Sequence, residues 1–127
     1  MGMEDRKPSP EEMKEMKQLL VEAMESGAFG MSTGLIYDPG IFADTEEIVE
    51  LCRIVKEYVG IYATHIRNES DLLVEAVMEA IEVGKKAGVR VEISHHKASS
   101  KKNWGLVRTT LDLIQYYRLW SAATRRY

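Results

Sequence analysis

The sequence predicts an α/β fold in which parallel strands alternate with helices. Apolar residues recur at helical spacing in four segments, and short apolar segments separate those helices. The motifs "THIR" and "SHHK" lie one βα unit apart, because His65 and His95 are separated by 30 residues. A chain of 127 residues that is 45% apolar can bury a real core. It is about half the length of an eight-stranded βα barrel, which needs about 250 residues. We therefore expect three βα units, forming either a small open sheet or a piece of something larger.

The first predicted element is a helix over residues 9–27. Ser9 has the position of an N-cap, a proline follows it, and Glu12 stands where a capping box needs an acid. Gly27 is a plausible C-terminal cap. Residues 1–8 precede the first helical signal, and we expect them to be flexible.

A strand and a second helix are expected next. Residues 28–34 are small, apolar and bounded by glycine, which favours a buried strand. Asp44 or Thr45 can cap a helix over residues 45–60, whose apolar side chains form one face. Cys52 belongs to that face, so we expect it to be a small buried apolar residue.

The pattern of strand and helix then repeats. Residues 61–66 and 89–96 read as strands, and residues 68–88 between them read as a helix. A fourth helical pattern begins near Leu106. Residues 116–127 form an atypical tail that carries no strand pattern. We expect a single domain over the whole chain.

Composition and charge exclude several classes of function. The net charge of −3 comes from acidic and basic residues mixed along the helices, which argues against a nucleic-acid partner. No apolar run approaches the length of a membrane span, and the N-terminus is too charged for a secretory signal, so we expect a cytoplasmic location. A single cysteine excludes an intrachain disulfide and a cysteine-rich metal site.

The three histidines of the chain all lie where predicted strands end. Ligands bind at this edge of parallel α/β sheets, and side chains from neighbouring strands can reach a common metal ion. Strand alternation allows only one of His95 and His96 to share a face with His65, and we assign that place to His95. The alternative is that these histidines are polar strand-end residues satisfied by hydrogen bonds to loops.

Other polar side chains follow the same strands. Arg67 and Lys97 each lie two residues beyond a histidine and carry charge suited to a carboxylate or phosphate, although each also reads as an exposed loop cation. Tyr37, in a turn-rich loop, can offer a phenol to a ligand or cover a core edge. We assign Glu69 and Asp71 to a helix N-terminus, where acids favour the dipole without a catalytic role.

Three stretches of the sequence resemble the N-acyl-D-amino-acid deacylases (D-aminoacylases) of the amidohydrolase superfamily. These stretches are "GAFGMSTGLIYDPGIFADTEEI", "GIYATHIRNESDLLVEAVMEAIEVGKKAGVRVEISHHKAS" and "KKNWG". The resemblance implies part of a metal-dependent (β/α)8 barrel that hydrolyses N-acylated D-amino acids. It implies that His65 and His95 are metal ligands, with zinc as the metal. It also implies that Lys97 helps to hold the substrate carboxylate and that Tyr37 contacts the substrate.

The chain departs from that family in the groups that complete the site. It has no H-x-H motif before His65, no cysteine in the place of the family's metal-binding cysteine, and no final strand with the aspartate that moves the proton. We therefore expect a fragment without independent activity. The alternative is a non-catalytic subunit that associates with itself or a partner, which would supply the missing ligands. Open sheet edges and an apolar sheet face favour self-association into a homo-oligomer.

Overall fold

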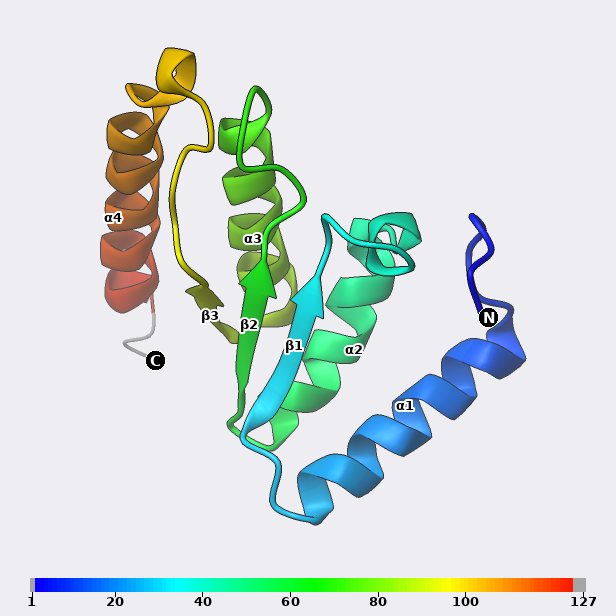
Figure 1. Ribbon diagram of the computed structural model, residues 1–127. Helices are drawn as coiled ribbons and strands as arrows, with labels where there is room; N and C mark the ends of the chain where they lie inside the picture. Colours follow the sequence, from blue (N-terminus) through cyan, green and yellow to red (C-terminus); the bar gives the residue numbers. More distant parts are fainter. Residues whose placement is uncertain (1, 125–127) are drawn as a thin grey trace.

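The chain forms a parallel sheet with helices packed on one of its faces (Figure 1). The computed structural model describes residues 2–124, with side chains up to residue 121. In order, the described elements are α1 (Pro10–Glu25), β1 (Gly30–Gly34), the 3₁₀ turn η1 (Gly40–Phe42), α2 (Thr45–Glu57), β2 (Ile61–His65), α3 (Leu73–Ala87), β3 (Arg90–Ile93), the 3₁₀ turn η2 (Lys101–Asn103) and α4 (Leu106–Thr124). This order confirms the predicted α/β class.

The strands lie in chain order, so each βα unit places its strand next to the preceding one. β2 is central and pairs in parallel with β1 on one side and with β3 on the other. The register aligns Gly34 with His65 and Thr64 with Ile93. All described strands therefore end at one edge of the sheet, and the loops after them converge there (Figure 1).

The helix ends follow the capping signals in the sequence. The Ser9 hydroxyl accepts the Glu12 N–H while the Glu12 carboxylate accepts the Ser9 N–H, which completes the capping box. Asp44, rather than Thr45, caps α2 by accepting the N–H of Glu47. α2 ends before Gly60, because the left-handed turn falls on Val59, with φ of 58°.

The core lies between the sheet and the helices. Tyr62 and Thr64 of β2 point into it and are almost completely buried, and the Tyr62 hydroxyl lies 2.8 Å from the Thr33 hydroxyl. Cys52 is fully buried in the same cluster, as predicted, and burial raises the pKa of its thiol to about 12. A second cluster joins α3 to the first turns of α4.

The opposite face of the sheet corrects one expectation. Strand alternation turns Ala63 and His65 away from the helices, and Ala63 lies in register between Ser32 and Glu92, which are both exposed. The prediction of an apolar face is therefore wrong: apart from Ile61, which lies between Gly30 and Arg90, the strand side chains on this face are small or polar.

The third strand is shorter than expected. β3 ends at Ile93, before the histidines, whereas the sequence predicts a strand to residue 96. Residues 116–124 continue α4. Residues 125–127 of the predicted atypical tail, and Met1 of the predicted flexible N-terminus, lie outside the described residues. No helix in the described part of the chain has the length and hydropathy to cross a membrane.

Candidate metal centre

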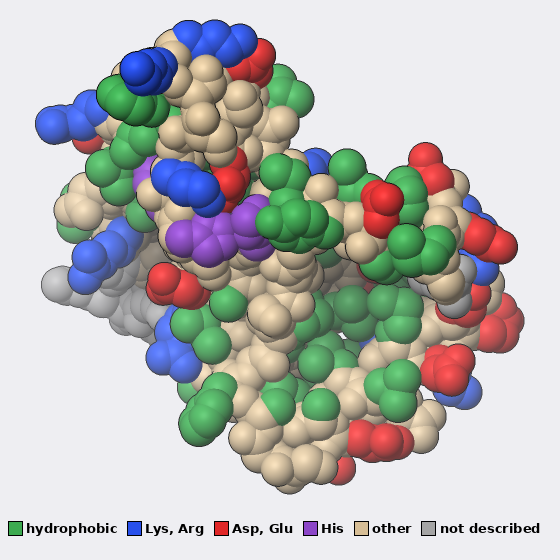
Figure 2. All heavy atoms as spheres, viewed as in Figure 1, with side chains coloured by type: hydrophobic (Ala, Val, Ile, Leu, Met, Phe, Trp, Pro, Cys, Tyr) green, Lys and Arg blue, Asp and Glu red, His purple; other side chains and the backbone are tan. Residues whose placement is uncertain are grey.

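The predicted histidine pair meets at the carboxyl edge of the sheet. His65 is the last residue of β2, and His95 lies two residues beyond the end of β3. Nδ1 of His65 and Nε2 of His95 are 2.8 Å apart, and the ring centroids are 4.4 Å apart. Figure 2 shows the histidines side by side on the surface, next to a basic and an acidic side chain. The sequence prediction that these two residues share one site agrees with this geometry.

His95 reaches this place by a different route from the one that strand alternation suggests. The last backbone hydrogen bond between β2 and the β3 segment joins Ser94 N–H to the Thr64 carbonyl, and His95 then turns with φ of 37°, in the left-handed region. His96 follows and points away, so that its Nε2 lies 2.8 Å from the Thr110 hydroxyl of α4. The structure thus places His95, and not His96, beside His65, but strand alternation is not the reason, because β3 ends at Ile93 and neither histidine belongs to it.

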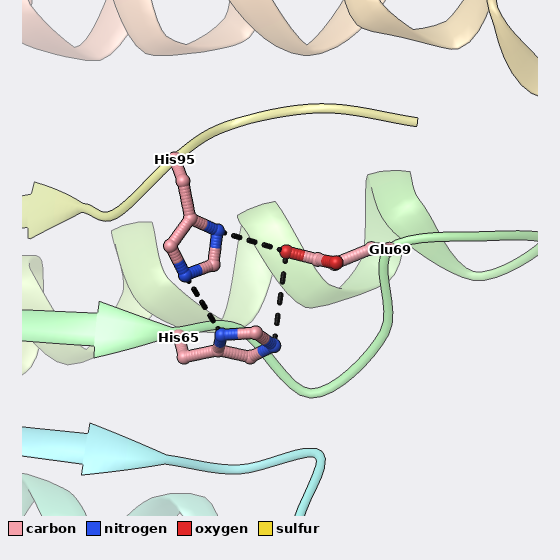
Figure 3. A group of neighbouring side chains, drawn as sticks. All are labelled: His65, Glu69 and His95. Carbon is pink, nitrogen blue, oxygen red and sulfur yellow. Dashed lines mark hydrogen bonds and ion pairs between the residues drawn. The ribbon is translucent and has the colours of Figure 1, made fainter. Parts of the chain in front are cut away.

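Glu69 completes the cluster, and the sequence analysis does not predict its place there. Its Oε1 lies 3.1 Å from His95 Nδ1 and 3.7 Å from His65 Nε2 (Figure 3). The carboxylate is only 8% exposed. α3 begins at Leu73, so Glu69 belongs to the loop before the helix, and the helix-dipole interpretation was wrong. The available signal was its position four residues beyond His65.

The loop that carries Glu69 is shaped by short polar side chains. The Asn68 Oδ1 accepts the backbone N–H of Ser70 at 2.8 Å and that of Leu72 at 3.2 Å, a local turn typical of asparagine. The Glu69 carbonyl accepts the Ser99 N–H at 2.8 Å from the loop after β3. The loops that follow β2 and β3 are therefore joined directly at the site.

Lys97 contributes a positive charge to this cluster. Its Nζ lies 2.6 Å from the Glu69 carboxylate and 3.2 Å from His95 Nδ1, and half of its side chain is exposed. Burial raises the pKa of Glu69, but the Lys97 ammonium and the two histidines together lower it by more, so the pKa of Glu69 lies below its ordinary value. Glu69 is therefore a carboxylate at neutral pH.

Tyr37 and Arg67 take different places. The Tyr37 ring lies over His65, with ring centroids 5.1 Å apart, and the side chain is 61% exposed. The Arg67 guanidinium turns away from the histidines and binds Glu79 together with the carbonyls of Ile41 and Ala43. The structure therefore places Tyr37 beside the candidate site, whereas Arg67 joins structural elements and is not available to a ligand there.

The donor set fits a divalent metal ion. His65, Glu69 and His95 offer two nitrogens and an oxygen that all lie within 4.8 Å of one another. His65 Nε2 is buried and has no hydrogen-bond partner among the described residues. Imidazole and carboxylate ligands suit zinc and neighbouring transition metals. A site for such an ion, at the end of parallel strands, is typical of metal-dependent hydrolases built on βα barrels.

The comparisons with known proteins give the family. The chain is 46% identical over 110 residues to a D-aminoacylase of Alcaligenes xylosoxydans xylosoxydans, and 45% identical over 112 residues to an N-acyl-D-aspartate deacylase of the same organism. These matches cover 87% of this chain but only 23% and 22% of those proteins. The chain thus spans about a quarter of the length of the curated relatives it matches. No protein-family model matches the chain.

Solved structures agree with the sequence relationship. A crystal structure of D-aminoacylase, which defines a novel subset of amidohydrolases, matches this chain with a TM-score of 0.86 at 41% identity. An N-acyl-D-glutamate deacylase from Bordetella bronchiseptica, in complex with zinc and a phosphonate inhibitor, matches with a TM-score of 0.87 at 38% identity. Each match covers 91% of this chain and 24% of the other. By sequence and by fold, the chain belongs to the D-aminoacylase-like amidohydrolases and corresponds to part of their barrel.

Proposed function

We propose that this chain supplies part of the metal and substrate site of an N-acyl-D-amino-acid deacylase, and that it lacks hydrolytic activity by itself. The observation that carries the proposal is the convergence of His65 and His95, whose ring nitrogens approach to 2.8 Å at the carboxyl edge of the sheet. The relationship to deacylases, one of them solved with zinc, supports zinc as the metal.

The residues around the pair suit the chemistry of that class. His65 and His95 would hold the ion, and a bound zinc ion supplies Lewis acidity for amide hydrolysis. Lys97, half-exposed beside His95, would bind the carboxylate of an N-acyl amino acid. Tyr37 would cover one side of the substrate above His65.

The inactivity of the isolated chain follows from what hydrolysis needs. A group must take a proton from the attacking water and deliver it to the leaving amine. Glu69 is the acid nearest to the histidines in the described residues, and its carboxylate is already engaged by Lys97 and His95. We therefore propose that the proton-transfer group lies outside these residues.

The experiment measures zinc binding and hydrolysis on the purified chain. We expect one zinc ion per chain, weakened at least tenfold by His65→Ala or His95→Ala, and no release of amino acid from N-acetyl-D-amino acids. His96→Ala is the matched control and should retain zinc, because His96 faces Thr110. Hydrolysis that a chelator abolishes would contradict the proposed inactivity, and zinc binding unchanged by both site variants would contradict the metal site.

A second candidate function is a self-associating or partner-binding subunit whose missing ligands come from another chain. The outer sides of β1 and β3 have no strand partner among the described residues, which favours it. We also propose that the chain is cytoplasmic. Sedimentation velocity over a range of concentrations tests self-association, and a constant monomer mass would contradict it.

A further inference from the structure

An open pocket lies between the start of α1 and the first turns of α2, two helices that pack against each other (Figure 1). Its volume is about 460 Å³. The wall on the α1 side is mainly apolar and is formed by Pro8, Pro10 and Met13. None of the lining residues belongs to the candidate metal centre, so the pocket is a separate feature of the surface.

The rest of the lining is charged, and acids outnumber bases. Two lysines and four acids give these residues a net charge of −2. Three of the acids already have a basic partner, because Asp44 pairs with Lys7, Glu50 with Lys17, and Glu46 with a lysine of α3. The negative balance favours a cationic ligand. The charged lining residues are Lys7, Lys17, Asp44, Glu46, Glu47 and Glu50.

Glu47 is the acid of this pocket that has no partner. The residue is only 8% exposed, and no group in the described part of the chain donates a hydrogen bond to its carboxylate. Its Oε2 is completely buried, so Oε1 is the oxygen that can face the pocket. Burial and the charge of Asp44 raise the pKa of Glu47. A buried carboxylate without a partner is unfavourable, and a cation in the pocket would compensate its charge.

The donor groups select among the classes of cation. Within the described residues, three metal-binding side chains come close enough together only at the histidines, so this pocket is not built for a divalent metal ion. A guanidinium binds a carboxylate best through both oxygens, and Oε2 of Glu47 is not accessible. An ammonium is a compact charge that needs one oxygen. An aliphatic stem attached to it would lie along the apolar wall.

We propose that this pocket binds a primary aliphatic amine, whose ammonium donates to Glu47 and whose stem packs against Pro8, Pro10 and Met13. The carboxylate shares its charge over both oxygens, so an ammonium at Oε1 compensates the charge of the whole group. The complex has one charge-assisted hydrogen bond and a short, partly buried stem. We therefore expect a dissociation constant on the order of 1 mM. This binding site goes beyond the proposed function and does not depend on it.

The first experiment is isothermal titration calorimetry of the purified chain with n-butylammonium chloride at neutral pH and constant ionic strength. 1-Butanol has the same stem without the charge, and we expect no measurable binding. Methylammonium has the charge without most of the stem and should bind about tenfold more weakly. Binding of 1-butanol as tight as that of n-butylammonium, or equal affinity for the two amines, would overturn the proposal.

The second experiment compares two substitutions in α2. Glu47→Gln should weaken n-butylammonium at least tenfold, because the ammonium loses its charged acceptor. Glu57→Gln is the matched control: it makes the same change at the exposed end of the same helix and should bind as the parent chain does. Unchanged affinity in Glu47→Gln, or an equal loss in Glu57→Gln, would overturn the proposal.

A stability measurement accompanies the binding data. Glu47→Gln removes an unpaired buried charge and keeps the shape of the side chain, so its urea midpoint should be at least that of the parent chain. Saturating n-butylammonium should raise the midpoint of the parent chain and leave that of Glu47→Gln in place. A parent midpoint that does not respond to the amine would overturn the proposal without reference to any variant.

A variant of the metal centre separates the two sites. His65→Ala should bind n-butylammonium as the parent chain does, because His65 is not part of the pocket. Loss of amine binding in His65→Ala would place the amine at the histidines and would overturn the proposal. A parent chain that binds the amine but no zinc would contradict only the metal site.

Discussion

The loops after β2 and β3 carry the same pattern, a histidine followed two residues later by a cation, and use it differently. Arg67 is half-buried and binds Glu79 and two backbone carbonyls, so it joins the end of β2 to α3 and to the segment that leads into α2. Lys97 is half-exposed and lies within the histidine cluster. The difference shows that equal spacing after a strand does not give equal function. The planar fork of arginine suits a junction of several acceptors, and the single ammonium of lysine suits a site open to a ligand.

The largest expected effect is on folding stability, which should fall much more when Arg67 is replaced than when Lys97 is replaced. Arg67→Met should lower the free energy of unfolding by about 3 kcal/mol, because it leaves the Glu79 carboxylate half-buried without its main partner. Lys97→Met, the matched variant, should cost less, about 1 kcal/mol, because the half-exposed Lys97 ammonium makes fewer contacts than the Arg67 guanidinium and His95 stays beside the Glu69 carboxylate. Urea denaturation measures both. Equal losses would break the distinction between a structural and a site cation.

Exchange of one cation for the other gives a smaller effect. Arg67→Lys keeps the charge but cannot reach Glu79, Ile41 and Ala43 together, and we expect a loss of about 2 kcal/mol by the same denaturation measurement. Lys97→Arg does not touch the contacts of Arg67, and its free energy of unfolding should stay within about 0.5 kcal/mol of that of the parent chain. A tolerated Arg67→Lys would show that charge, and not geometry, holds the junction.

Cys52 reports local opening on the side of the molecule that Arg67 stabilises. The thiol is fully buried, and burial raises its pKa to about 12, so thiol reagents should label it only when α2 opens. Labelling at neutral pH should be at least tenfold faster in Arg67→Met and unchanged in Lys97→Met. Equal labelling rates in the two variants would indicate that Arg67 does not hold α2.

The smallest effect concerns the cap beside the Arg67 junction. A hydrogen bond from Lys7 and the Glu47 N–H lower the pKa of Asp44 below its ordinary value of 3.8. The ionised Asp44 carboxylate therefore stabilises the fold above that pH, and this stabilisation is lost as the pH falls through the lowered pKa. Asp44→Asn should show a weaker fall of the urea midpoint between about pH 5 and pH 3 than the parent chain. An identical fall would exclude Asp44 as a contributor.

The sequence predicted the elements that depend on local signals. The capping box at Ser9, the burial of Cys52 and the parallel βα order all follow from residue type and spacing, and the structure confirms them. The pairing of His65 with His95 was also predicted, because carboxyl ends of neighbouring parallel strands converge.

The missed features depend on loop conformation. The position of Glu69 follows from the Asn68 turn, and that of His95 from a left-handed residue after the strand. Neither has a periodic signal in the sequence. Arg67 was misjudged for the same reason, since its acceptors are backbone carbonyls of a distant loop and a carboxylate of the next helix. The metal-ligand roles of His65 and His95, and the substrate roles of Lys97 and Tyr37, stay predictions.

X-ray absorption spectroscopy of the zinc-loaded chain tests the central claim most directly, because it reports the ligands of the ion itself. The account predicts two imidazole ligands with Zn–N distances of about 2.0–2.1 Å, with the remaining positions filled by other oxygen or nitrogen donors. His65→Ala and His95→Ala should each remove one imidazole from the spectrum. A spectrum without imidazole scattering, or one that neither variant changes, would contradict the account.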